Sequence, residues 1–478
     1  MDRLPTETLC VIFNLSVFQD ASNANIETKA DITEGRTWPC IMDLSSGPWS
    51  VSRVCTRWRA ITTSLPSLWS RFLLSTKDLA LERKKDPNQM FERWLTLSGT
   101  SKLSFLIQTD GVCNVGTPDL FHTLIGHADR WERIEIINSS YAFWSRLHHR
   151  GVKHHLRSLK SVTFLAEDDN HSYIHDGYQD PFNYSYYSLF EQAPCLHSLI
   201  NRDYFALFDI PMPWEQLTEY EGSHRISYLD HLSVLHKTPN LTFCTLAIDY
   251  DQFHSPESDI DQKSLTLPKL RTLRVKLFTS DAETADFSSR IRSMSLPFLQ
   301  SLSIETDGSP MVTPYDAFAE ALRSSSAILQ RLELSGNDAD PECVIGLLRA
   351  SSSVSFLSLG ILDTDRVSDL LNTVIGRLGV EENDEIFLPH LHTLELKLPG
   401  TFSIRDVDFT VLASVIRTRR NTASGGIRNL ELLFGEEAIE YECRLLSFEP
   451  NMLPPRLEVL QEEGLSIAVR VSSDVKED

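Results

Sequence analysis

The sequence predicts an α/β protein: a small all-α module followed by a solenoid of strand–helix repeats, with a parallel sheet on its concave side and helices on its convex side. Three observations lead to this fold class. The chain has 478 residues, too many for one ordinary core. Short leucine-rich segments recur along most of it, and the first 75 residues show helical periodicity instead. The hydrophobic fraction of 41% is that of a folded protein.

The first predicted element is an amphipathic helix in residues 4–13, LPTETLCVIF. Pro5 suits the first turn, where a missing N–H costs nothing. Leu9, Ile12 and Phe13 follow at the spacing of one helix face. Residues 19–47 are polar and weakly periodic, so we expect a loop insertion there.

Helical periodicity resumes at WSVSRVCTRWRAITTSLPSLWS, residues 49–70. Val51, Val54, Cys55 and Trp58 recur at the spacing of a single helix face. A thiol inside an apolar stripe has a raised pKa, so the pattern favours a structural Cys55 over a nucleophile. The three arginines of the stretch are expected on a solvated face: Arg53, Arg57 and Arg59.

Together these segments carry the motif Leu-Pro-x-Glu-x-Leu-x-x-Ile-Phe, then Val-Cys-x-x-Trp-Arg-x-Ile, then Pro-x-Leu-Trp. The matching residues are Leu4, Pro5, Glu7, Leu9, Ile12, Phe13, Val54, Cys55, Trp58, Arg59, Ile61, Pro66, Leu68 and Trp69. The motif resembles the F-box, in the version common in basidiomycete fungal proteins. The insertion at 19–47 lengthens the spacing usual in that family.

The resemblance implies docking on the Skp-type adaptor of a cullin–RING ubiquitin ligase. The residues that would contact the adaptor are Leu4, Pro5, Glu7, Leu9, Ile12, Phe13, Val54 and Trp58. The Leu-Pro turn and the apolar helix faces would form the centre of that contact. Trp58, Ile61 and Trp69 would mainly hold the module together.

The remainder of the chain contains repeated segments of the form Leu-x-x-Leu-x-(Leu/Ile/Val). They are LRSLKSVTF (156–164), PCLHSLI (194–200), PNLTFCTLAI (239–248), PKLRTLRVKL (268–277), PFLQSLSI (297–304), AILQRLELSGN (327–337), SSVSFLSL (352–359), PHLHTLELKL (389–398) and GIRNLELLF (426–434). WERIEI (131–136) and WEQLTEY (214–220) are weaker members. One such segment is a weak signal, but nine to eleven in succession indicate an array.

The spacing of these segments is typical of leucine-rich repeats. The second leucine of seven units is assigned to Leu246, Leu273, Leu302, Leu332, Leu357, Leu394 and Leu430, which are 27, 29, 30, 25, 37 and 36 residues apart. Helices are expected between the strands, for example over 316–326 and 342–353, and LEVLQEEG (457–464) and LSIAVR (465–470) as the last helix and strand. This half also resembles the C-terminal region of the same fungal F-box proteins.

The predicted organisation is therefore an F-box domain over residues 1–75, a linker helix over 76–98 and a leucine-rich-repeat-like solenoid over 99–478. The formal net charge of −21 disfavours nucleic acid and anionic membranes as partners. The eight cysteines are scattered without a CxxC pair, which favours reduced thiols. No segment reads as a signal peptide or a membrane span, so we expect a soluble cytoplasmic or nuclear protein.

Three segments invite a chemical interpretation. The histidines of HHRGVKHH (148–155) lack the spacing of a zinc site, so a solvated loop is expected. Residues 249–261 are acidic but lack the glycine and glutamate of a calcium loop. Residues 167–190 contain five tyrosines and no lysine or arginine, which leaves open a substrate-contacting loop or a structural insertion. No catalytic residue, metal site or cofactor is predicted, because no P-loop, GxSxG, HExxH or GxGxxG motif is present.

The leading hypothesis is a non-catalytic substrate receptor of an SCF-type ligase, whose solenoid or a protruding loop binds an unidentified protein. The alternative is a leucine-rich-repeat interaction scaffold that acts outside any ligase, with the N-terminal helices as a cap. An enzymatic function is not expected.

Overall fold

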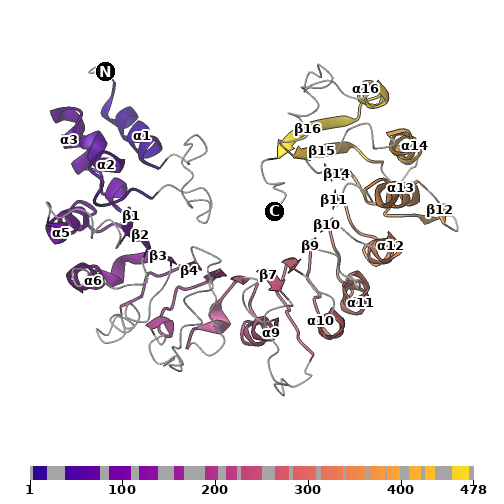
Figure 1. Ribbon diagram of the computed structural model, residues 1–478, viewed down its shortest axis with the longest axis horizontal. Helices are drawn as coiled ribbons and strands as arrows, with labels where there is room; N and C mark the ends of the chain where they lie inside the picture. The colour runs from indigo at the N-terminus through magenta and orange to yellow at the C-terminus, as the bar shows by residue number, and fades with distance from the viewer. Residues whose placement is uncertain are drawn as a thin grey trace. The chain divides into compact units, whose positions relative to one another are not determined.

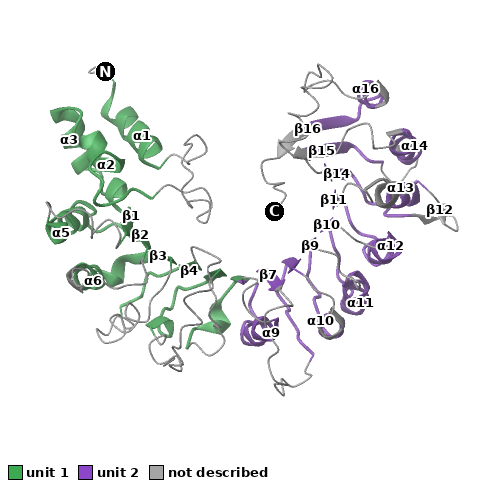
Figure 2. Ribbon diagram, in the orientation of Figure 1, with its two compact units in different colours: residues 1–221 green, residues 222–478 purple. Residues whose placement is uncertain are grey.

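A computed structural model gives the α/β architecture that the sequence predicts, with parallel strands joined by helices (Figure 1). The described residues are 4–18, 38–75, 86–108, 118–137, 155–165, 189–202, 211–222, 228–249, 264–278, 284–307, 314–336, 341–361, 367–379, 381–382, 385–398, 409–420, 426–435 and 455–472. The chain divides into two compact units, residues 1–221 and 222–478 (Figure 2).

The first unit begins with helices and continues as a sheet whose strands pair in sequence order. Its elements are α1 (Thr6–Val17), α2 (Gly47–Ser52), α3 (Thr56–Thr63), η2 (Pro66–Trp69), β1 (Arg71–Ser75), α5 (Pro87–Leu97), β2 (Leu103–Gln108), α6 (Pro118–Ile125), η3 (Ala128–Arg130), β3 (Trp131–Ile137), β4 (Ser161–Leu165), β5 (Ser198–Arg202), η6 (Trp214–Gln216) and β6 (Glu219–Gly222). Neighbouring strands from β1 to β5 are parallel.

The second unit alternates strands and helices, and its main sheet is parallel. Its elements are α9 (Tyr228–Lys237), β7 (Phe243–Asp249), β8 (Thr272–Phe278), α10 (Thr284–Arg292), β9 (Ser301–Asp307), α11 (Tyr315–Ser325), β10 (Arg331–Gly336), α12 (Pro341–Arg349), β11 (Phe356–Ile361), α13 (Val367–Leu378), β12 (Glu381–Glu382), β13 (Glu385–Ile386), β14 (Thr393–Leu398), α14 (Phe409–Arg420), β15 (Asn429–Gly435), α16 (Pro455–Glu462) and β16 (Ser466–Ser472). The last predicted helix and strand are confirmed as α16 and β16.

The leucine ladder of the second unit follows the predicted repeats with one correction. Leu302, Leu332 and Leu357 lie opposite one another on adjacent strands, and all three are fully buried. The assignment of Leu246 to this ladder is wrong, because Cys244 lies opposite Leu273 and Leu246 lies two residues further on. Cysteine behaves as a small hydrophobic residue, and burial raises the pKa of Cys244.

The helices of the second unit lie along one side of its strands (Figure 1), and the repeat leucines of these strands are buried. The predicted inward stripes are confirmed for two of these helices: Ala317, Ala321 and Leu322 are buried on α11, and Val344, Leu347 and Leu348 on α12. Packing of an amphipathic face, more than intrinsic propensity, stabilises helices of this length.

Tyr315, the first residue of α11, gives unit 2 a dependence on alkaline pH. It is 1% exposed, and burial raises its pKa to about 12. An unfolded tyrosine ionises near pH 10, so between pH 10 and 12 the unfolded chain loses its proton first and is favoured. We expect ionisation of this residue to lower the free energy of unfolding of unit 2 by about 2 to 3 kcal/mol as the pH rises from 10 to 12.

Denaturant unfolding of the native chain and of Tyr315→Phe at pH 9 and pH 11.5 measures this contribution. The difference in unfolding free energy between the two pH values is expected to be smaller in Tyr315→Phe, while Cys244 contributes equally to both chains. Equal pH dependence in the two chains would contradict the assignment.

Of the loop expected over 19–47, residues 19–37 lie outside the described residues. The described part is more ordered than a loop. The segment 38–46 pairs with β1: the Ile41 N–H donates to the Leu73 carbonyl at 3.3 Å, and the Leu73 N–H donates to Pro39 at 3.0 Å. Ile41 and Met42 are buried, and the Trp49 indole donates to the Ile41 carbonyl at 3.0 Å. Most of residues 38–46 are apolar, but they form a short run without regular alternation beside a polar segment, so the sequence pattern did not indicate this pairing.

The sheet begins earlier than the predicted repeats. β1 lies inside the range expected for the helical module, and α5 lies inside the range expected for a linker helix, 76–98. Phe72 of β1 stacks on Phe105 of β2 at 5.4 Å between ring centroids and meets Phe91 of α5 edge-on at 5.6 Å. β1 and α5 therefore share a core with β2.

Candidate functional site

Helix α1 has one buried and one exposed apolar face. Leu9, Phe13 and Val17 recur every four residues and are buried. On the other side, Val11 and Leu15 are 60% and 61% exposed, and Ile12 is 40% exposed. Apolar side chains that are four apart lie side by side on a helix surface, so Val11, Ile12 and Leu15 form one exposed patch, here called the α1 patch.

The start of α1 is held in place by α3. Pro5 precedes the first turn, and its carbonyl accepts the first helical hydrogen bond, from the Leu9 N–H at 3.1 Å. The Arg57 guanidinium donates to the Leu4 carbonyl at 2.6 Å, while the Leu4 side chain is 38% exposed. Exposed Glu7 lies in the first turn, where a carboxylate interacts favourably with the helix dipole.

The predicted apolar stripe through Cys55 is wrong. The helix ends at Ser52 and a new one starts at Thr56; Cys55 caps it, with its Sγ accepting from the Trp58 N–H at 3.4 Å. The break places Cys55 and Val54 on the surface, Val54 at 60% exposure. Periodicity counted across a break joins residues that do not share a face.

The three arginines of this segment were expected on a solvated face, but each of them donates a hydrogen bond to a backbone carbonyl. Besides the Arg57 contact to Leu4, Arg53 donates to the Leu44 carbonyl at 3.2 Å, and Arg59 donates to the Ser52 carbonyl at 3.1 Å. Each reaches a backbone carbonyl at a helix end or in a connecting segment, where intrahelical partners are missing. A carbonyl acceptor has no sequence signature, so these bonds could be found only in the structure.

The structure separates the eight candidate adaptor-binding residues into groups. Leu4, Pro5, Glu7, Ile12 and Val54 are exposed, Leu9 and Phe13 are buried at 1% exposure, and Trp58 is half-buried. The Trp58 ring packs on Phe13 with 4.8 Å between centroids. Ile61 and Trp69, expected to hold the module together, are buried. Sequence reasoning missed Val11 and Leu15, which are the most exposed apolar residues of α1.

Other chemistry is limited in the part of the chain that the structure describes. It contains no group of three His, Cys, Asp or Glu side chains placed to hold a metal ion. Its helices are all too short or too polar to cross a membrane. The segments 249–261, 148–155 and 167–190 lie wholly or almost wholly outside the described residues.

No protein-family model matches the chain, and no curated protein matches it. The structure itself defines a coarser class: an α/β protein of strand–helix repeats with a parallel sheet, preceded in the described residues by the helices α1, α2 and α3.

Proposed function

We propose that this chain is the substrate-recognition subunit of an SCF-type cullin–RING ubiquitin ligase. Its N-terminal helices would act as an F-box that docks on a Skp-type adaptor, and its repeats would hold an unidentified protein substrate. The observation that carries the proposal is the α1 patch, exposed within a segment whose sequence resembles the F-box motif.

The energetics of the α1 patch favour a protein partner. Burial of an exposed Val, Leu or Ile side chain contributes about 1.5–3 kcal/mol. Val11, Ile12 and Leu15, with Leu4 at the helix start, therefore offer several kcal/mol to an apolar partner surface. Contiguous exposed side chains of this kind are typical of the core of an interface.

The proposed role is non-catalytic. A receptor that holds a substrate on its repeats and docks on the ligase through its N-terminal helices raises the local concentration of substrate lysines near the ubiquitin carrier. Ubiquitin transfer itself would be performed by other subunits. No cofactor or metal is needed for this role.

The test is binding of the purified chain to a Skp-type adaptor, with the variant Ile12→Asp plus Leu15→Asp. Both positions are exposed, so the substitution leaves the core intact, whereas Leu9→Asp would place a charge in the interior. Two buried carboxylates in the interface should weaken binding at least about 100-fold.

The matched control is Phe298→Asp plus Ile328→Asp, which changes two exposed apolar residues of the second unit. It should bind the adaptor like the native chain. Absence of adaptor binding by the native chain, or undiminished binding by the α1 variant, would overturn the proposal and favour a scaffold outside any ligase.

A further inference from the structure

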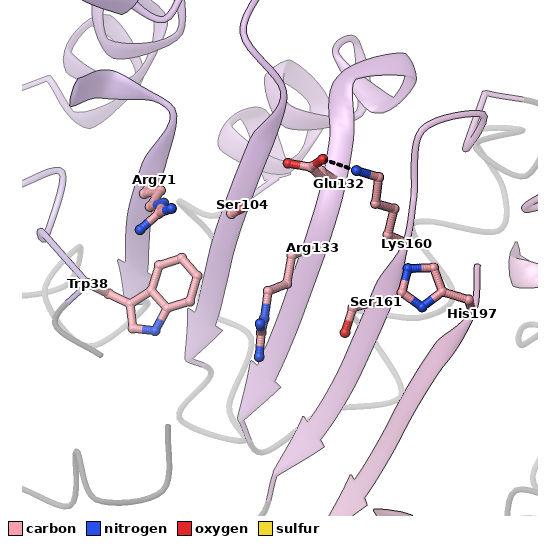
Figure 3. Close-up of a pocket in the computed structure, with 8 residues that line it drawn as sticks. All are labelled: Trp38, Arg71, Ser104, Glu132, Arg133, Lys160, Ser161 and His197. Carbon is pink, nitrogen blue, oxygen red and sulfur yellow. Dashed lines mark hydrogen bonds and ion pairs between the residues drawn. The ribbon is translucent and has the colours of Figure 1, made fainter. Parts of the chain in front are cut away.

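A second candidate site lies within the first unit, on the sheet face opposite the helices. It is a hollow of about 300 Å³ at the beginning of strands β1 to β5 (Figure 3). Its lining consists of Trp38, Arg71, Ser104, Glu132, Arg133, Lys160, Ser161 and His197. Adaptor docking by the α1 patch uses none of these residues.

The strand register gives the hollow a regular floor. Arg71, Ser104, Arg133 and Ser161 lie opposite one another on four adjacent strands, so arginines alternate with serines. Adjacent strands are about 4.8 Å apart, which places the two arginine backbones roughly 10 Å apart with Ser104 between them. Two long guanidinium side chains can reach a common ligand above a small serine.

The charge balance of the hollow is positive, in a chain whose net charge is −21. Arg133 pairs with Glu135 at 2.8 Å, and Lys160 pairs with Glu132 at 2.8 Å. The hydrogen bond to Glu132 raises the pKa of Lys160, so this amine stays protonated. Arg71 makes no ion pair with a described residue, and its guanidinium lies over the Phe18 ring at 5.0 Å.

An unsatisfied donor lies beside these cations. The indole Nε1 of Trp38 is buried and has no hydrogen-bond acceptor among the described residues. Trp38 packs against the buried cluster of Leu106, Ile137 and Leu165, and Figure 3 shows its ring between Arg71 and Arg133. A buried N–H without an acceptor costs about 1–3 kcal/mol, which a ligand oxygen can recover.

We propose that this hollow binds an oxyanion carried on a peptide of a partner protein, with Arg71 and Arg133 as its main contacts. Guanidinium forks bind carboxylate and phosphoryl oxygens through paired charge-assisted hydrogen bonds. Ser104 and Ser161 provide hydroxyl donors on the floor, and Lys160 and His197 lie at the opposite end from Trp38 (Figure 3). The anionic group is either an aspartate or glutamate carboxylate or a phosphorylated side chain.

The test uses the purified full chain and three arrays of eleven-residue peptides with identical flanking sequences. The central residue is phosphoserine in one array, aspartate in the second and asparagine in the third. We expect the best anionic peptides to bind at least about tenfold more tightly than their asparagine counterparts, and added salt to weaken this preference. The stronger of the two anionic arrays identifies the natural group.

The variant Arg71→Gln should reduce anionic peptide binding about tenfold, since it removes one guanidinium fork. Arg71 is exposed, so the fold is kept, and Arg133→Gln provides a second variant. The matched control is Arg331→Gln, because Arg331 starts β10 as Arg71 starts β1 but lies in the other unit. Equal binding of anionic and neutral peptides, or unchanged binding by both hollow variants, would overturn the inference. The peptide assay contains no adaptor. A failure of peptide binding can therefore be distinguished from a failure of adaptor binding.

Discussion

Replacement of Trp94 by alanine is expected to lower the free energy of unfolding of the first unit by about 3–5 kcal/mol. Trp94 is fully buried and meets Trp49 and Trp69 edge-on, with ring centroids 5.7 Å and 5.0 Å away. Its indole N–H donates to the Trp69 carbonyl at 2.7 Å. Alanine would leave a cavity and an unsatisfied buried carbonyl, and both effects destabilise the fold.

Tryptophan fluorescence measures this effect selectively, because all eight tryptophans precede residue 222. The denaturation midpoint followed by fluorescence should fall clearly in Trp94→Ala. The control is Trp58→Ala, since Trp58 is half-buried and its truncation should cost less. If Trp58→Ala lowered the free energy of unfolding as much as Trp94→Ala or more, the packing of Trp49, Trp69 and Trp94 would not be the centre of this core.

The second large effect is expected from Leu332→Ala in the second unit, again about 3–5 kcal/mol. Leu332 lies on β10 between Leu302 of β9 and Leu357 of β11, and all three are fully buried. Loss of this side chain opens a cavity beneath two neighbouring repeats. In a repeat array, nearest-neighbour contacts carry much of the stability, so both adjacent repeats should weaken.

Hydrogen exchange of the β9, β10 and β11 amides measures this loss locally. Faster exchange is expected on all three strands, with little change in the fluorescence transition of the first unit. Ile328→Ala is the control, because Ile328 belongs to the same repeat but is 68% exposed. If protection from hydrogen exchange were unchanged in Leu332→Ala, or reduced equally in Ile328→Ala, the buried row of Leu302, Leu332 and Leu357 would not be what stabilises these repeats.

The repeat pattern could be predicted from sequence because it depends on local chemistry. Alternating leucines indicate a strand with one buried face wherever they occur, and Leu332 and Leu394 could be placed inward without any knowledge of their neighbours. The inward stripes of α11 and α12 follow from helical spacing in the same way. The repeat motif did not indicate Cys244, because a buried thiol occupies the position that leucine holds in the other repeats.

The N-terminal segment shows where such reasoning stops. Leu9 and Phe13 share a face with helical spacing, but which face of α1 is covered depends on α2, α3 and η2, which pack against it, and could not be derived from α1 itself. The break before Thr56 reversed the expectation for Cys55 and exposed Val54. A helix break depends on competing backbone and tertiary interactions that periodicity does not record.

The sequence by itself determined the strand–helix repeat, its inward leucines and the motif in the first 75 residues, because these depend on spacing along one chain segment. Only the tertiary structure decided which residues of different strands meet. A register shift between Leu103 and Ser104 places Arg133, and not Glu132, opposite Ser104. Because of that shift Ser104 lies between Arg71 and Arg133. Without the shift it would lie between Arg71 and Glu132. Register depends on turn geometry and on burial of one face across neighbouring strands, so no single segment encodes it.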